Sequence, residues 1–432
     1  MKDVKLIAEK ALTELKNAGA DMASCTAEYS ETREFNVDGG EFSLFRTLFD
    51  DSLTMTGYRA GRKGTSMINR FDDASIAAAA ADCMTAAEAS EPDECWDVAP
   101  GDGWVSFTQG CPEPDMDRLF MRLRELMDDL KENHPLILVE QLISSHRRFR
   151  RVYRNSKGAS FETVGGCYQV DIMYSGHEGD NASSFFGSSI LTADLDKPLM
   201  ECGSLARDIA DVEKQIYTQP VEGKFQGVAV FAPGCLAEVI NTAIGNFAGD
   251  NAILAGTGLW KDELGRRVAG EALNISFKPL DQRVVIGERY TPEGFVAEDY
   301  DFIKDGVLQS FDLSLYVANR TGGERSKNSG GSMFIRPGGR ALEDIIASID
   351  DGILVNRISG GNPGANGEFS MVAKNSFLIK NGAVAGAVSE TMINGNLADM
   401  LKDIYAISSE TVCDGNSCLP WCAFGGVTVS GK

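Results

Sequence analysis

Glycine-punctuated runs of alternating apolar and polar residues fill the second half of this chain, and they limit what it can fold into. The chain has 46 glycines in 432 residues, and glycine readily adopts the tight turns and bulges that connect short strands. The segments Lys304–Val307 and Lys380–Ala383 place Asp-Gly and Asn-Gly between apolar runs, which is the pattern of two-residue β-hairpins. We therefore expect a β-rich domain, with a closed or strongly curved, barrel-like sheet and a few helices.

The first half alternates helices with runs of strands, which predicts an α+β fold. An amphipathic helix over residues 1–20 precedes alternating runs over 22–70, the pattern of a meander of four or five strands. Asp73 then caps an alanine-rich helix, and the acidic stretch after it contains the proline and glycine of a linker. The expected organisation is an N-terminal α+β unit at 1–90, a linker at 91–113, a second α+β unit at 114–219 and the β-rich domain at 220–432.

The charge balance argues against a nucleic-acid partner. Lysine and arginine total 41 against 63 acidic residues, a formal net charge of −22, whereas a nucleic-acid surface needs a basic patch. The densest basic run, His146–Arg151, alternates like a strand, so we interpret it as an exposed strand with charged gatekeepers. The first residues lack the apolar core of a signal peptide, and no apolar run is long enough to span a membrane. We expect a cytoplasmic protein whose ten cysteines are reduced and which has no membrane partner.

Familiar catalytic motifs are missing from the sequence. It contains no phosphate-binding loop, no dinucleotide fingerprint and no nucleophile elbow. Its three histidines are His134, His146 and His177, so the second half has none. His177 begins a His-Glu pair, but the pair lies in a YSGHEGD turn, whereas a zinc-protease helix needs both histidines on one face. A histidine-type zinc site is therefore not expected in this chain.

One helix and a series of short segments carry a family resemblance. The helix expected after Pro233 contains Asn241–Asn246, which reads NTAIGN. The other segments are Asn155–Gly158, Lys261–Gly265, Phe311–Tyr316, Asn366–Ser370, Thr391–Leu397 and Val427–Lys432. In this order they resemble the motifs of the TldD/PmbA protease family across essentially the whole chain, and they are most similar to its PmbA type. The resemblance implies an N-terminal α+β region and a β-rich C-terminal domain.

The resemblance also locates the missing zinc chemistry. TldD-type members carry HExxxH on this helix, with two histidines as zinc ligands and the glutamate as general base. Here the ligand positions are Asn241 and Asn246, and the base position is Thr242. An amide oxygen is a poor zinc ligand, and threonine is too weak a base to deprotonate a bound water. We expect these three positions to be degenerate, with no cofactor on this chain and zinc on a partner chain.

A cysteine cluster lies near the position of the third zinc ligand in TldD-type members. Cys413, Cys418 and Cys422 are spaced so that three thiolates could share a metal, with Asp414 as a possible fourth donor. The alternative is a set of buried or reactive thiols near a subunit surface.

The leading functional hypothesis is a PmbA-like subunit of a peptide-degrading metalloprotease. The resemblance implies a TldD-like zinc-bearing partner, or self-association as a homodimer, around a chamber that takes unfolded peptide. Glycine-rich Asn328–Gly331 could let a substrate backbone approach closely, and sheet edges could hold it by strand addition. One alternative is a non-enzymatic interaction protein that modulates DNA gyrase, a role long ascribed to the family. Another is an independent hydrolase that uses the cysteine cluster or an unrecognised carboxylate site.

Overall fold

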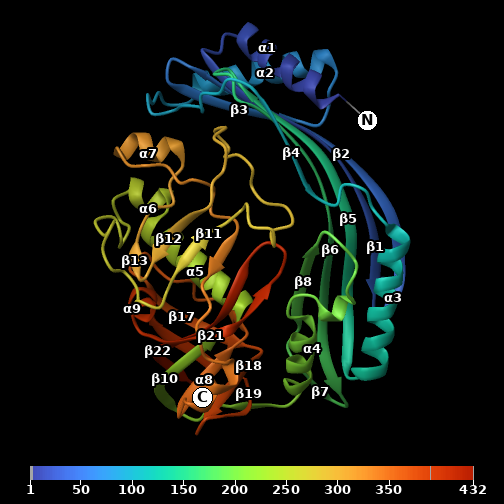
Figure 1. The fold of residues 1–432 in the computed structure, drawn as a ribbon, viewed down its shortest axis with the longest axis vertical. Coiled ribbons are helices and arrows are strands. Elements are labelled where there is room, and N and C mark those ends of the chain that lie inside the picture. The colour runs from blue at the N-terminus through green and yellow to red at the C-terminus, as the bar shows by residue number, and fades with distance from the viewer. Residues whose placement is uncertain (1–2, 390, 432) are drawn as a thin grey trace.

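The N-terminal part of the chain forms one long, arched sheet. A computed structural model describes residues 3–389 and 391–431, so the expectations that fall on residues 1–2, 390 and 432 lie outside the described residues. The strands are β1 (Met22–Asp38), β2 (Glu41–Arg59), β3 (Arg62–Ile68), β4 (Trp104–Gly110), β5 (Ile137–Asn155), β6 (Ser160–Glu178), β7 (Asn181–Ala182) and β8 (Phe186–Thr192). Their order is β3-β2-β1-β5-β6-β4, with β7 and β8 also paired to β6. Figure 1 shows this sheet curving around the rest of the molecule.

Helices cover the two ends of the arch. They are α1 (Val4–Asn17), α2 (Asp73–Ala89), α3 (Met116–Asn133), the 3₁₀ turn η1 (Leu199–Glu201) and α4 (Leu205–Lys214). Helices α1 and α2 share an apolar core with β1 and β2, and α3 and α4 share another with β5, β6 and β8. None of the described helices is long and apolar enough to cross a membrane.

The expected N-terminal units are joined by this one sheet. Strand β1 of the first pairs along Ser24–Asp38 with β5 of the second, and β4, inside the expected linker at 91–113, pairs in parallel with β6. The expected four or five strands over 22–70 are three, because β2 runs without a break through Phe49–Ser52. Such long-range pairing leaves no local sequence signal.

The basic run of β5 is not an exposed edge. Strand β5 lies between β1 and β6, so its side chains face those of both neighbours. Arg148 pairs with Glu31, Arg150 donates to Glu162 over 2.6 Å, and Arg147 and Arg151 both pair with Glu28. His146 is buried and bonds the Cys111 carbonyl over 2.7 Å. The charges are neutralised within the sheet, which corrects the expectation of gatekeeper residues on an exposed strand.

The C-terminal lobe, residues 218–431, contains a branched open sheet. The sheet follows the order β13-β12-β11-β14-β22-β10-β15-β18-β19-β9, and a branch carries β16, β17, β20 and β21. The strands are β9 (Thr218–Pro220), β10 (Lys224–Phe231), β11 (Ile275–Phe277), β12 (Tyr300–Lys304), β13 (Val307–Leu308), β14 (Met333–Ile335), β15 (Asp351–Val355), β16 (Arg357–Ser359), β17 (Glu368–Lys374), β18 (Ser376–Lys380), β19 (Ala383–Ser389), β20 (Thr391–Asn396), β21 (Ile404–Cys413) and β22 (Cys418–Ser430).

The barrel-like expectation is wrong for this lobe, although the fold is mixed α+β as expected. The path through the sheet ends at β13 and β9, which do not pair with each other. The sheet branches instead because β22 is long enough to pair with β10, β14, β20 and β21. The two predicted hairpin turns are confirmed by left-handed backbone at Asp305-Gly306 and Asn381-Gly382.

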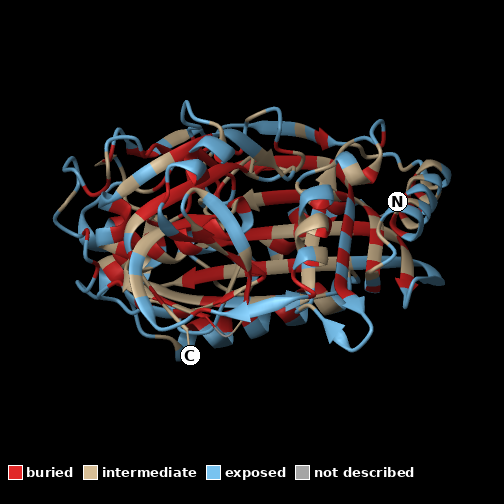
Figure 2. Ribbon diagram, turned by 90° about the horizontal axis from the view of Figure 1, so that it is seen from below, coloured by how far each residue is buried: buried red, intermediate tan, exposed pale blue. Residues whose placement is uncertain are grey.

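Helix α5 (Pro233–Ala248) is embedded in this lobe. Its apolar face, which includes Leu236, Val239, Ile240 and Phe247, packs into the largest core of the molecule. The remaining helices are α6 (Asp250–Leu254), α7 (Leu315–Thr321), α8 (Leu342–Ala347) and α9 (Leu397–Lys402). Figure 2 shows the buried residues concentrated along the central strands, with exposed residues at the turns and outer helix faces.

The arch touches the C-terminal lobe near both of its ends. At one end, buried Asn155 donates to the Ala99 carbonyl over 2.8 Å, and the Ala99 amide donates to the Glu293 carbonyl over 2.9 Å. At the other end, the Leu191 amide of β8 donates to the Asp414 carbonyl over 3.2 Å. The concave side of the arch therefore faces the lobe that carries α5 (Figure 1).

We predict that Gly64→Ala destabilises the N-terminal lobe. Gly64 of β3 lies under α2, and a Cβ there would sit 1.9 Å from the Cys83 carbonyl oxygen and 2.5 Å from the Ala87 nitrogen. Both neighbours are backbone atoms, so the helix must shift, at a cost of about 1–3 kcal/mol in the free energy of unfolding. Urea unfolding measures this cost.

The matched control is Gly103→Ala, where a Cβ meets no atom within 4 Å. It should change the free energy of unfolding by less than about 0.5 kcal/mol. Equal effects of the two substitutions would contradict the close packing of α2 on β3.

Candidate functional site

The exposed stripe of α5 is the centre of the candidate site. We define it as Glu238, Asn241, Thr242, Gly245 and Asn246, which turn away from the core. Over 16 residues the helix is about 24 Å long. The three positions singled out in the sequence, Asn241, Thr242 and Asn246, thus lie together on its accessible side.

The hydrogen bonds of these side chains are local. The Thr242 hydroxyl donates to the Glu238 carbonyl one turn earlier over 2.8 Å, and the Asn246 amide donates to the Pro363 carbonyl over 3.0 Å. Asn246 therefore anchors the glycine-rich loop that precedes β17. The stripe supplies no imidazole or thiolate, and no group of three potential metal ligands is found across residues 3–389 and 391–431. The donor set does not fit a zinc ion.

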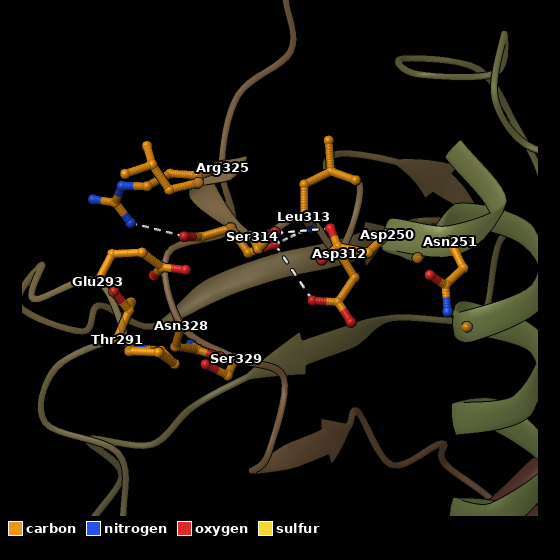
Figure 3. A pocket seen from close by; sticks show the side chains of 15 residues that line it. Asp250, Asn251, Thr291, Glu293, Asp312, Leu313, Ser314, Arg325, Asn328 and Ser329 are labelled. Atoms are coloured by element: carbon orange, nitrogen blue, oxygen red, sulfur yellow. Dashed lines mark hydrogen bonds between the residues drawn. The ribbon is translucent and has the colours of Figure 1, made fainter. Parts of the chain in front are cut away.

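A polar cavity of about 320 Å³ lies at the C-terminal end of the stripe. We call it the α5 C-terminal cavity; Gly245 of the stripe lines it, together with Asp250 at the start of α6. Figure 3 shows Arg325 and Glu293 on one side of the cavity and Asp312, Asp250 and Asn251 on the other, where α5 and α6 meet. Glu293 belongs to the loop that contacts the arch at Ala99. The cavity therefore lies next to one of the contacts between the lobes.

Buried polar side chains hold the cavity wall in shape. Asn328, which is 1% exposed, donates to the Glu298 carbonyl over 2.8 Å and accepts from the Gly330 amide over 2.9 Å. Glu288 accepts from the Ser329 amide over 2.7 Å and from its hydroxyl over 3.0 Å. The predicted segment Asn328–Gly331 is thus beside the cavity, with its backbone fixed by side chains.

Carboxyl groups dominate the electrostatics of this cavity. Burial raises the pKa of Asp312, and the nearby Asp250 carboxylate raises it further. Burial likewise raises the pKa of Glu288 behind the wall. Arg325 is the basic residue of the lining, with its guanidinium carbon 3.7 Å from the Phe295 ring centroid. The lining offers acceptors for peptide N–H groups and cations, and Arg325 offers donors for carbonyl groups.

A second cavity, of about 220 Å³, lies at the N-terminal end of α5. We call it the inter-lobe cavity because α4 and β8 line it from the arch, while α5, β21 and β22 line it from the C-terminal lobe. Asp208 of α4 accepts hydrogen bonds from Ser188 over 2.9 Å and Ser204 over 2.7 Å. Burial raises the pKa of Asp208 to about 6. Neighbouring Asp211 raises this pKa, whereas Arg207, stacked on Trp421, lowers it.

The cysteine cluster is not assembled as a metal site. Cys413 and Cys418 face each other across the β21–β22 turn and form a disulfide, which corrects the expectation of reduced thiols for this pair. Cys422 is fully buried in the core beside α5, and burial raises the pKa of its thiol. Cys418 packs in a different apolar cluster, against Val284 and Phe334. The three thiols therefore do not converge, which removes support for an independent hydrolase based on them.

Several site residues were missed in the sequence. Asp208 and Glu288 belong to ordinary helical or strand-like stretches, and Asp312 lies in Phe311–Tyr316, which was singled out only for its family resemblance; their burial depends on contacts across the molecule. The other histidines lie outside the site: His134 Nδ1 is 3.2 Å from the Glu213 carboxylate, and His177 bonds the Ser175 hydroxyl over 2.9 Å. Both are on the arch.

Comparison with known proteins gives consistent relatives. Residues 226–431 match the family described as the PmbA/TldA metallopeptidase C-terminal domain. Metalloprotease PmbA from Escherichia coli O157:H7 is 24% identical over 424 residues, covering 91% of this chain and 88% of that protein.

Two solved structures share the fold over the whole chain. TldE from Thermococcus kodakarensis has a TM-score of 0.83 at 20% identity, covering 98% of this chain and 100% of that one. A proposed modulator of DNA gyrase from Bacteroides thetaiotaomicron VPI-5482 has a TM-score of 0.83 at 19% identity, covering 100% of both chains. The open, branched C-terminal sheet and the arched N-terminal sheet thus belong to a known architecture.

We predict that Asp208→Asn stabilises the protein at neutral pH. Because the pKa of Asp208 is raised to about 6 by folding, its neutral form favours the folded state, and this contribution is lost as pH rises from about 4 to above 6. The amide stays neutral and keeps an acceptor for the serines. The variant should gain about 1–3 kcal/mol relative to wild type between pH 4 and pH 7.5, measured by urea unfolding.

Asp281→Asn is the control, for which the opposite change in stability is expected. Hydrogen bonds from Arg283 lower the pKa of Asp281 to about 2, so its charged form favours the folded state above its ordinary pKa. That variant should lose stability at pH 7.5. If Asp208→Asn gains the same stability at pH 4 and at pH 7.5, the interpretation that burial raises the pKa of Asp208 is wrong.

Proposed function

Because this chain belongs to the PmbA/TldD family, we propose that it is the PmbA-like subunit of a peptide-degrading metalloprotease and that a zinc-bearing partner chain of the same family supplies the metal. In this proposal the chain completes the chamber and positions extended peptide. Its own α5 is the counterpart of the helix that carries HExxxH in TldD-type members.

One observation carries the proposal: the stripe of α5 is accessible but lacks zinc-protease chemistry. Asn241, Thr242 and Asn246 are where a metal and a base would be needed, and none of them is suited to either role. Asn246 instead holds the loop at Pro363. Zinc, when bound to the partner, would polarise a substrate carbonyl and activate water there.

The surroundings of the stripe support a peptide-positioning role. Helix α5 is about 24 Å long and has a cavity at each end, and this length matches roughly seven residues of extended chain. At one end the α5 C-terminal cavity presents Asp312, Glu293 and Arg325, and at the other the inter-lobe cavity presents Asp208 and Arg207. Peptide N–H and carbonyl groups need such acceptors and donors, whatever the side-chain sequence.

We predict that the purified chain alone holds less than about 0.1 zinc per chain and does not hydrolyse unfolded casein, because the exposed stripe of α5 has no histidine or cysteine and no group of three potential metal ligands occurs in the described residues. Mixed with the zinc-bearing family member from the same genome, it should raise hydrolysis at least tenfold over that member alone. Elemental analysis and release of fluorescent casein fragments measure the two quantities.

Two variants of this chain separate positioning from metal binding. Asn241→Ala should leave the hydrolysis rate of the mixture within about twofold, because no metal depends on it. Arg325→Ala should raise KM for the peptide more than it lowers kcat. Stoichiometric zinc on this chain alone that is lost in Asn241→Ala, together with activity of the chain alone, would overturn the proposal.

A further inference from the structure

Strand β2 leaves a long sheet edge without a strand beside it. Its residues Leu53–Arg59 pair with β3, but Glu41–Ser52 have only β1, on the other side. Among the described residues no other strand covers this stretch. Figure 1 shows β3 confined to the end of the sheet near α1 and α2, while β2 continues along the arch. Alternate N–H and C=O groups of Glu41–Ser52 therefore point away from β1 and can accept another strand.

This free edge is unusually apolar. Every residue from Glu41 to Asp50 is exposed, including Phe45 at 55% and Phe49 at 64%. The other large apolar side chains of the stretch are Phe42, Leu44 and Leu48. Native proteins usually protect such an edge with charge, proline or a covering element. An apolar, uncovered edge of this length is typical of a surface that another chain covers.

A hollow of about 680 Å³ continues the edge where β3 ends. It is lined by Asp50 and Ser52 of β2, by Met67 and Ile68 of β3, and by residues of α2 that include Asp82. A strand added beside β2 would run in line with β3, with its end in this hollow. The five exposed apolar side chains supply on the order of 400 Å², about half of what one partner buries in a specific interface, so the hollow is needed to complete the contact.

The charges at the two ends of the free edge indicate what kind of chain can pair with it. Glu41 lies at one end of the apolar run, and Asp50 lies at the other with Asp82 across the hollow. The nearby arginines are already paired, Arg46 with Glu34 and Arg70 with Asp72. The ends of the edge are therefore negative.

A second copy of this chain is a poor match. Antiparallel pairing that places Phe42 opposite Phe49 also places Glu41 opposite Asp50, and parallel pairing in register places each acid beside itself. Like charges directly opposite on neighbouring strands destabilise the pair. An apolar strand with Lys or Arg at its ends avoids this repulsion.

We propose that the free edge of β2, Glu41–Ser52, together with the hollow beside β3, docks an extended strand of a different protein chain, apolar in the middle and basic at both ends. Resting on the proposed function, that chain is the zinc-bearing subunit. The two subunits then share a continuous sheet, and the edge that is exposed in the single chain becomes buried in the complex.

The test measures the Kd between the full chain and the zinc-bearing family member from the same genome, by native mass spectrometry and light scattering. Phe49→Lys should raise Kd at least tenfold, because it removes the most exposed apolar side chain of Glu41–Ser52 and adds a charge of the partner's sign. The double variant E41K/D50K should also raise Kd, with a loss that shrinks as salt increases. Leu264→Lys, at an exposed leucine of the C-terminal lobe (53%), should leave Kd unchanged.

Three results would overturn the proposal: a Kd unaffected by Phe49→Lys, a stable homodimer that Phe49→Lys dissociates, or no complex at all. Unchanged circular dichroism and Tm establish that each variant is folded. The interface and the proposed function fail separately. If the complex hydrolyses casein and its Kd is unaffected by Phe49→Lys, the proposed interface is wrong and the proposed function stands. If the complex depends on Phe49 but never hydrolyses casein, the proposed function is wrong and the proposed interface stands.

Discussion

Burial of one face of α5 in the core of the C-terminal lobe decides which residues of that helix can meet a ligand. Leu236, Val239, Ile240 and Phe247 are inaccessible, so the helix cannot rotate without exposing several large apolar side chains, each worth about 1.5–3 kcal/mol. The direction in which the exposed stripe of α5 faces is therefore fixed. The chemistry available at the site is then set by what the sequence places on that stripe, which is amide, hydroxyl and glycine where a zinc protease needs imidazole and carboxylate.

The arch gives this stripe its surroundings. It meets the C-terminal lobe at the Ala99–Glu293 contact and at the Leu191–Asp414 contact, and a cavity lies next to each. Neither lobe alone builds the inter-lobe cavity, because Asp208 comes from one and Trp421 from the other. Pairing of β1 with β5 over Ser24–Asp38 makes the arch one continuous sheet, so the spacing of its two contacts is set by that sheet. The same continuity leaves β2 at an edge, where its apolar residues remain available to a partner.

Local patterns in the sequence predicted much of the secondary structure. The helices around Val4–Asn17 and Pro233–Ala248 and the two Gly-containing hairpins follow from short-range periodicity and turn chemistry. The positions Asn241, Thr242 and Asn246 were expected on a helix, and in the structure they lie on the exposed side of α5. The features that the sequence did not predict depend on residues far apart in the chain. Strand β4 pairs with β6 across more than 50 residues, and the arginines of β5 are neutralised by Glu28, Glu31 and Glu162. Branching at β22 opened the sheet that was expected to close. Asp208 and Asp312 acquire their burial only when the whole chain is folded.

The position of zinc in the assembled complex tests most directly the central claim that the partner chain, and not this chain, holds the metal. Crystals of this chain with its zinc-bearing partner, measured on both sides of the zinc absorption edge, give an anomalous difference map in which every zinc ion appears as a peak. The account predicts a peak beside the partner's helix and none within about 2.5 Å of the side-chain oxygens of Asn241 or Asn246, the range of zinc–ligand bonds being about 2.0–2.3 Å. A peak bound to the exposed stripe of α5 in this chain would contradict it.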